Sequence, residues 1–248
     1  MHAVVSAPPT GHTLLLTPGA MITLHPYLYG ELPYDPLTQL IPISLIGTSD
    51  LAVAVAADHP ARNIHELMRW YNENPKLSSC GTSGAGSVSH FVMIEIARKA
   101  NSAVVFVHYR SALQQIEALI EGSLKTAVVV PWIALPHVDS GELRVLATTG
   151  VARSALLSEV PTMRESGIDV VVREWAGLFA PVGTPQEIVN RLADATAEAL
   201  ATPAVKASFR RFGLDRGEVG PVGFAAMVKA DYDRWGGVVK RSGLKAES

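Results

Sequence analysis

The chain has 248 residues, of which 48% are hydrophobic and 18% charged, the composition of a folded protein rather than a disordered one. This length allows one large domain or two smaller ones. The formal net charge of −2 provides no positive field, which argues against nucleic acid or an anionic membrane surface as a partner. The single cysteine, Cys80, excludes an intramolecular disulfide and a cysteine-based zinc site. The most apolar stretch, residues 127–136, is far shorter than the ~20 residues that span a bilayer, so we expect no direct membrane insertion.

Strand-like and helical patterns alternate along most of the chain, which predicts an α/β fold with a mainly parallel sheet. The expected strands are residues 12–16, 41–46, 51–57, 77–80, 104–107, 126–130, 143–148 and 170–174.

Three helix starts carry recognisable capping residues. Asn63 with Glu66, and Thr184-Pro185 with Glu187, are typical of a helix N-terminus, and Thr202-Pro203 repeats the first half of that pattern. Near the end of the chain, apolar residues three or four apart over 223–241 predict one long amphipathic helix.

The most informative segment is the Gly/Ser/Thr-rich stretch from Ser78 to His90, which follows a predicted strand and leads into a helix near Ser87. Small residues allow close approach to the backbone, and the helix dipole with hydroxyls of Thr82, Ser83 and Ser87 favours an anion. A plain strand-to-helix turn, with Ser87 as the helix cap, explains the same residues. Both interpretations remain open from the sequence.

The common enzyme motifs are incomplete in this segment. The G-x-S-x-G elbow lacks its last glycine because Ala85 stands there, G-x-G-x-x-G ends at Ser89 instead of glycine, and no P-loop lysine follows. Cys80 could pair with His90 or His108 as a thiol nucleophile, although a cysteine that ends an apolar strand is typically a core residue. The scattered histidines form no helical metal-binding pair, so we predict no metal site.

Two further segments offer ligand contacts. Tyr109 and Arg110 follow another predicted strand and precede a helix expected at residues 112–121, where a hydroxyl and a guanidinium could bind a carboxylate. Trp175 could wall a cleft at a strand end. A packed aromatic and a surface cation are the alternatives.

Many short motifs in one order resemble the extracytoplasmic solute receptors of tripartite tricarboxylate transporters, also called Bug-type receptors. The resemblance covers essentially the whole chain. Its motifs are Gly11-His12-Thr13-Leu14-Leu15, His25-Pro26-Tyr27-Leu28-Tyr29, Leu32-Pro33-Tyr34-Asp35-Pro36, the Gly/Ser loop ending at His90, His108-Tyr109-Arg110, Leu135-Pro136-His137, Gly141-Glu142-Leu143-Arg144, Val160-Pro161-Thr162, Trp175-Ala176-Gly177-Leu178 and Trp235 with Val238-Val239-Lys240.

The resemblance implies a type II periplasmic-binding-protein fold, in which two α/β lobes joined by a hinge close on a small carboxylate without catalysis or a cofactor. The lobes would be residues 1–55 with 175–248, and residues 56–174. The implied partners are membrane transporter subunits, or alternatively a sensor kinase. The implied ligand-binding residues are Thr17, Thr82, Ser83, Gly86, Ser87, His90, Tyr109, Arg110 and Trp175.

The chain also departs from the family pattern. Its N-terminus has no signal-like segment, which alone indicates the cytosol, whereas the family is periplasmic. The first strand, ligand loop and helix of the family are expected to be missing, which leaves a non-binding remnant or an interaction module as an alternative function. Lys125 and Val129 stand where acidic residues are common, which favours a ligand without an amino group.

Overall fold

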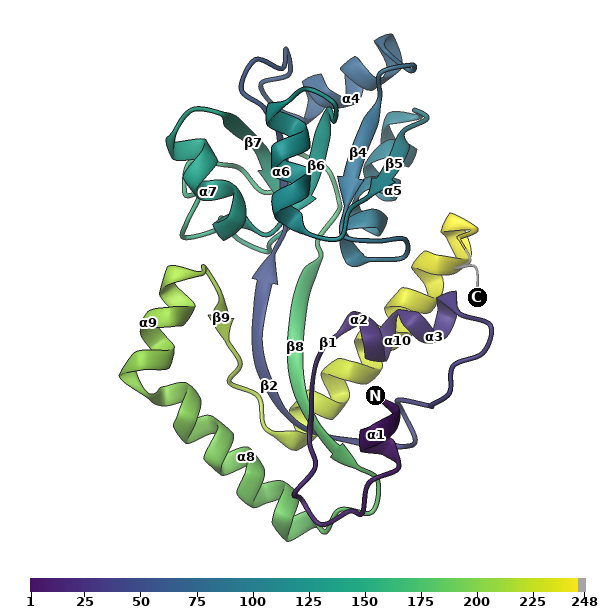
Figure 1. The fold of residues 1–248 in the computed structure, drawn as a ribbon, viewed down its shortest axis with the longest axis vertical. Helices are drawn as coiled ribbons and strands as arrows, with labels where there is room; N and C mark the ends of the chain where they lie inside the picture. The colour runs from purple at the N-terminus through teal and green to yellow at the C-terminus, as the bar shows by residue number, and fades with distance from the viewer. Residues whose placement is uncertain (245–248) are drawn as a thin grey trace. The chain divides into compact units, whose positions relative to one another are not determined.

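A computed structural model describes residues 1–244 and divides them into two compact units (Figure 1). Within the described residues, the first unit combines residues 1–48 with residues 174–244, and the second is Ser49–Arg173. The sequence-based lobes instead end at residues 55 and 174. Strand β3 (Ala52–Ala56) pairs with strands of the second unit, which places those residues there.

The first unit contains a four-stranded sheet in the order β1-β8-β2-β9. These strands are β1 (Leu15–Pro18), β8 (Arg173–Pro181), β2 (Leu40–Asp50) and β9 (Asp215–Arg216). The pairs β1 with β8 and β2 with β9 are antiparallel. The helices of this unit are α1 (His2–Val5), α2 (Ala20–Thr23), α3 (His25–Leu28), α8 (Gln186–Ala201), α9 (Pro203–Arg211) and α10 (Pro221–Ser242).

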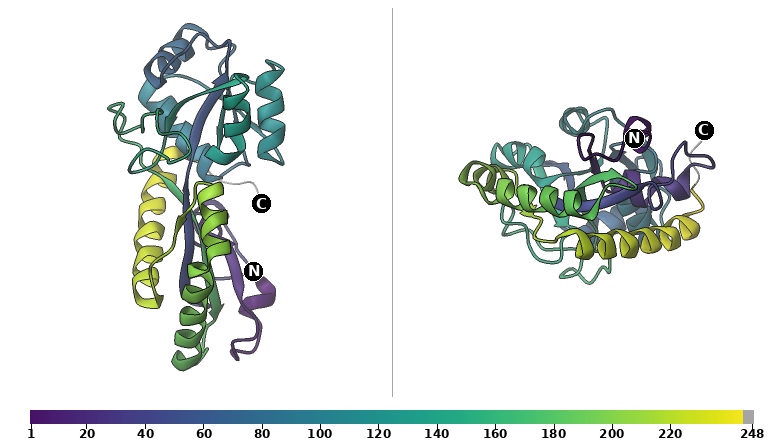
Figure 2. Two further views of the ribbon diagram at one scale, coloured as in Figure 1. Left: turned by 90° about the vertical axis from the view of Figure 1, so that its left-hand side faces the viewer. Right: turned by 90° about the horizontal axis from the view of Figure 1, so that it is seen from below.

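The long helices α8 and α10 lie on opposite faces of this sheet, as Figure 2 shows. Alternation along β8 explains why, since successive side chains of a strand point to opposite faces. Trp175 and Phe179 pack with Phe224 of α10, whereas Ala180 packs with Val189 of α8. The long helix predicted over residues 223–241 is confirmed as α10. Strand β8 supplies side chains to the apolar clusters on both faces of the sheet.

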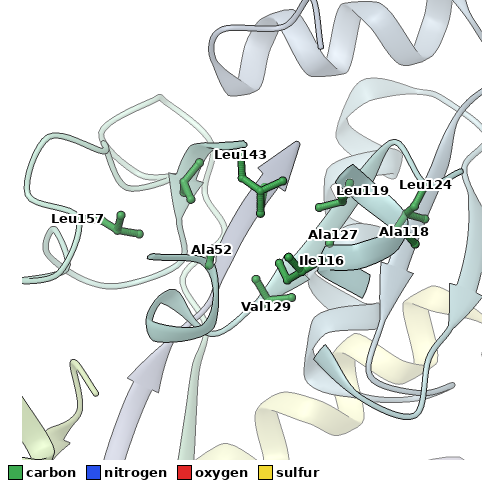
Figure 3. Close-up of a cluster of buried hydrophobic side chains, with 12 residues drawn as sticks. Ala52, Ile116, Ala118, Leu119, Leu124, Ala127, Val129, Leu143 and Leu157 are labelled. Atoms are coloured by element: carbon green, nitrogen blue, oxygen red, sulfur yellow. The ribbon is translucent and has the colours of Figure 1, made fainter. Parts of the chain in front are cut away.

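The second unit has a five-stranded sheet in the order β5-β4-β6-β3-β7. The strands other than β3 are β4 (Ser79–Thr82), β5 (Val105–His108), β6 (Thr126–Val129) and β7 (Leu143–Thr148). The helices are α4 (Ile64–Glu73), α5 (Val88–Ala100), α6 (Ala112–Ile120) and α7 (Pro131–Asp139). Helices α6 and α7 cover the apolar cluster drawn in Figure 3, which includes Ile116, Leu119, Leu124, Ala127 and Leu143.

The α/β class is confirmed, but the expectation of a mainly parallel sheet is wrong. In the five-stranded sheet β4 pairs in parallel with β5 and with β6, while β3 is antiparallel to both β6 and β7. Strand β3 follows β2 after one residue, without a crossover helix, and inserts between the two strands that α7 connects.

The three capping predictions have three different outcomes. Asn63 caps α4 by accepting from the Glu66 N–H at 2.9 Å. At α8 the cap position belongs to Pro185, and the Thr184 hydroxyl donates to the Pro181 carbonyl instead. At α9 Thr202 holds the predicted N-cap position before Pro203, but its hydroxyl donates to the Ala199 carbonyl and accepts no N–H of its own helix.

Two strand positions also differ from prediction. The first strand is Leu15–Pro18 rather than residues 12–16. The strand expected at 170–174 is instead Arg173–Pro181, because the Val172 N–H donates to the Thr149 carbonyl in a loop. The sequence pattern did not predict the full length of β8, because the strand contains Gly177 and ends at Pro181, and both residue types are unfavourable in strands.

Candidate functional site

The Gly/Ser loop lies between the end of β4 and the start of α5, within the second unit. Strand β4 lies next to the edge strand of its sheet and has parallel neighbours on both sides, and its C-terminal residue Thr82 pairs with His108 of β5. Ser87 then caps α5, a helix of 13 residues. Gly84 and Gly86 adopt φ values of 147° and 70°, a backbone region that side chains disfavour. These glycines allow the chain to turn sharply from strand into helix.

Hydroxyl groups hold the loop in this shape. The Ser87 Oγ accepts from the His90 N–H at 3.2 Å and donates to the Gly84 carbonyl at 2.8 Å. The Ser89 Oγ accepts from the Ser83 N–H at 3.2 Å and lies 3.0 Å from the Ser87 Oγ. The proton of Ser87 is thus used inside the loop, while Ser83 remains exposed at its outer side.

The start of α5 provides unpaired backbone donors. Within the part of the chain that the structure describes, the N–H groups of Val88 and Ser89 have no partner. The first N–H groups of a helix carry the positive end of its dipole and favour an anion. The loop can therefore bind a carboxylate through backbone N–H groups, with its serines positioning them.

His90 links the helix back to the loop. It is buried, and its Nδ1 accepts from the Gly86 N–H at 3.1 Å. Burial, with a smaller contribution from nearby His108, lowers the pKa of His90 to about 4. His90 is consequently neutral at pH 7, which an acceptor nitrogen requires.

The second predicted loop lies beside the first. Strand β5 pairs Thr82 with His108, and the Tyr109 N–H donates to the Thr82 carbonyl at 3.0 Å. Tyr109 packs against the α6 core cluster, while Arg110 is exposed. Both line an open pocket of about 520 Å³ with His108, Gln114, Glu117, Ala118, Glu121 and Ser123. The structure thus brings seven predicted residues into one region: Thr82, Ser83, Gly86, Ser87, His90, Tyr109 and Arg110.

Thr17 and Trp175 belong to the first unit. Thr17 pairs with Gly177 in the sheet and is buried. Trp175 is a buried core residue, and its indole N–H donates to the Asp231 carboxylate at 2.9 Å, which also accepts from the Thr23 hydroxyl at 2.8 Å. Trp175 is therefore a packed core aromatic in this structure. A ligand-binding role for Thr17 or Trp175 stays a prediction.

Sequence reasoning left Ser89 and His108 out of the site. Ser89 follows the cap residue by two positions, and its hydroxyl contacts both Ser83 and Ser87. His108 Nδ1 lies 2.7 Å from the Thr82 Oγ1. The serine spacing S-x-S was a local signal, but the histidine contact depends on strand pairing.

The structure contradicts the nucleophile interpretation of Cys80. Its thiol is fully buried and donates to the Gly81 carbonyl at 3.4 Å, and burial raises the pKa of the thiol well above its ordinary value. Thiolate character, on which cysteine chemistry depends, is thereby suppressed. Among residues 1–244 no group of His, Cys, Asp and Glu could hold a metal ion, and no helix there is long and apolar enough to cross a membrane.

Comparison with known proteins places the chain in a family. The sequence profile described as "Tripartite tricarboxylate transporter family receptor" matches residues 1–244. The chain belongs to this family. Its members are periplasmic solute-binding receptors, so the family and the fold point to a binding protein rather than an enzyme.

Individual relatives support this assignment. A UPF0065 protein from the tcbD-tcbE intergenic region of Pseudomonas sp. (strain P51) is 28% identical over 94% of this chain and 69% of its own length. The R. palustris protein Rpa4515, solved with adipate, is 25% identical with a TM-score of 0.88, covering 98% of this chain and 82% of that one. MatC from Rhodopseudomonas palustris, solved with bound malate, is 26% identical with a TM-score of 0.84, covering 96% and 82%.

Proposed function

We propose that this protein captures a small di- or tricarboxylate, or a related organic acid, for a tripartite tricarboxylate transporter. The observation that carries the proposal is the loop between β4 and α5, where unpaired N–H groups of Val88 and Ser89 begin a 13-residue helix. Two structurally similar family members are described with adipate and malate, which are both dicarboxylates. Backbone donors of this kind recognise carboxylates without supplying chemistry.

The proposal includes the periplasm as the site of action and membrane transporter subunits as partners. Both follow from family membership. A sensor kinase has no support in these relatives and is not part of the proposal. The hinge, and a ligand held between the lobes 1–55 with 175–248 and 56–174, remain predictions.

The test is a binding experiment with a matched capping control. Ser87→Ala removes the hydroxyl that shapes the loop, and Asn63→Ala removes the cap of α4 in the same unit. We expect the wild type to bind adipate or malate in titration calorimetry and to gain thermal stability, because a ligand of the native state stabilises it. Ser87→Ala should bind roughly 10-fold more weakly, because the loop loses the hydroxyl that holds its backbone N–H donors in position. Asn63→Ala should melt earlier with unchanged affinity.

Failure of the wild type to bind any member of a panel of di- and tricarboxylates, aromatic acids and acidic amino acids would overturn the proposal. That result would favour the non-binding remnant. Equal affinities of Ser87→Ala and Asn63→Ala would show that the Gly/Ser loop does not bind the ligand.

A further inference from the structure

His108 lies beside the strand that leads into the proposed site. It is the last residue of the edge strand β5, directly opposite Thr82 of β4. Neighbouring strands lie about 4.8 Å apart, so His108 is one strand spacing from the strand that enters the Gly/Ser loop. Its ring is exposed and lines the pocket that Tyr109 and Arg110 share.

The hydrogen bond to Thr82 determines where the proton of His108 lies. The Thr82 hydroxyl has one proton and two nearby acceptors, the His108 Nδ1 at 2.7 Å and the Gly84 carbonyl at 3.4 Å. The Gly84 contact is at the limit of a hydrogen bond, so we infer that the Thr82 hydroxyl donates its proton to Nδ1. A neutral imidazole then carries its own proton on Nε2. Partial desolvation of the ring lowers the pKa of His108, in agreement with a neutral ring.

The Nε2–H group is a donor with no partner among the described residues. The charged and titratable groups around the ring are His90 of α5, with ring centroids 5.0 Å apart, and Arg110, Glu117 and Glu121 along the shared pocket. Arg110 favours an anion in this pocket, whereas Glu117 and Glu121 disfavour one, and a neutral N–H adds a directed donor without further charge.

We propose that His108 is a ligand-binding residue, whose Nε2 donates a hydrogen bond to an oxygen of the bound carboxylate while Thr82 holds its Nδ1. This inference rests on the proposed function and adds a residue to that site. The oxygen belongs either to the carboxylate at the loop or to a second carboxylate or hydroxyl of the same ligand.

Two substitutions separate the two ring nitrogens. The amide of asparagine falls near the Nδ1 position, so His108→Asn keeps a partner for Thr82 and removes the outer donor. His108→Gln places an N–H donor near the Nε2 position. With adipate and malate as probes, we expect His108→Asn to bind roughly 10-fold more weakly than the wild type and His108→Gln to stay within about threefold. Succinate and a monocarboxylate of equal length distinguish the two oxygen sources.

Thermal melting of both variants, with His137→Gln as a surface control, establishes that they fold. Nitrogen-15 spectra of the wild-type histidines provide a readout that a merely structural role would not move. We expect an Nε2–H tautomer for His108 whose Nε2 shift changes on ligand binding. Equal affinities, a loss in His108→Gln as large as in His108→Asn, or an Nδ1–H tautomer would overturn the inference. If the wild type itself binds no carboxylate, the proposed function fails instead.

Discussion

At the scale of single residues, His90 must stay neutral for the Gly/Ser loop to keep its shape, because its Nδ1 accepts from the Gly86 N–H. Its pKa is lowered to about 4, while the unfolded chain retains the ordinary value near 6.5. Between these pH values the unfolded state binds the extra proton, so the free energy of unfolding falls as the pH drops from about 6.5 towards 4.

His90→Asn tests this dependence, since the asparagine oxygen can accept from Gly86 but does not titrate. Urea unfolding at pH 7, 6 and 5 should give a smaller loss for the variant than for the wild type. The pKa values of His25, His59 and His108 are lowered too, so some loss will persist in both proteins. If the free energy of unfolding fell equally with pH in both proteins, His90 would contribute nothing to the pH dependence.

Gln115 of α6 is a second residue with an energetic consequence. It is fully buried, and neither its Oε1 nor its Nε2 has a partner among the described residues. The amide lies over Gly81 of β4, where an added Cβ would be 3.2 Å from the Oε1. Unpaired buried amide atoms cost about 1–3 kcal/mol.

We therefore expect Gln115→Met, which has a similar volume and no amide, to raise the free energy of unfolding by about 1 kcal/mol. In thermal melting this corresponds to a rise of roughly 2–4 °C. Gly81→Ala is the companion variant and should be destabilising, since its Cβ would also be 2.6 Å from Leu124. A Gln115→Met protein that melts earlier than the wild type would indicate that the amide is paired.

How far these residues could be predicted depends on how local their causes are. Ser87 was predictable as a helix cap because the residues that it caps follow it directly. His108 was not, because its contact with Thr82 spans 26 residues and exists only once β4 and β5 pair. Trp175 had two interpretations, and only the position of Asp231 on α10 shows where its indole N–H is bonded.

At the scale of elements, the same local motif gave different outcomes at two helix starts. Asn63 has an extended backbone and lies immediately before α4, so its side chain reaches the first turn. Thr184 lies one residue too early, because Pro185 takes the cap position of α8. The conformation of the preceding loop determines which residue occupies the cap position, and the sequence motif does not specify that conformation.

Helix fraying provides the test of this difference. Asn63→Ala should speed amide hydrogen exchange at Glu66 and Leu67 in α4 by roughly 5- to 10-fold, since a lost cap costs about 1 kcal/mol. Thr202→Ala should leave exchange at the start of α9 within about twofold, because its hydroxyl caps no N–H there. Equal effects in the two helices would contradict the assignment.

Strand direction was the element-level feature that the sequence pattern could not provide. Apolar runs predicted β3, β6 and β7 well in position, yet nothing in them shows that β3 runs against both neighbours. The direction is set by pairing with β6 and β7, which follow β3 only after α4, β4, α5, β5 and α6.

At the scale of the whole molecule, each unit has its own buried cluster, which predicts that each can open separately. Cys80 reports on the second unit, because its buried thiol reacts only when that unit opens. Asn63→Ala should speed labelling by a thiol reagent, while Asp231→Ala, which disrupts contacts of the first unit only, should not. Faster labelling of both variants would mean that the units open together.

The order of the segments along the chain bears on how the protein is made. The second unit is one continuous stretch, Ser49–Arg173, whereas the first needs β8 and β9 to complete its sheet and α10 to complete its core. A chain that emerges from its N-terminus can therefore finish the second unit while Ile22, Leu40 and Leu45 still lack Phe224. Until the last helix is synthesised, those apolar side chains stay exposed. Exposed apolar surface of this kind promotes aggregation and is what chaperones bind.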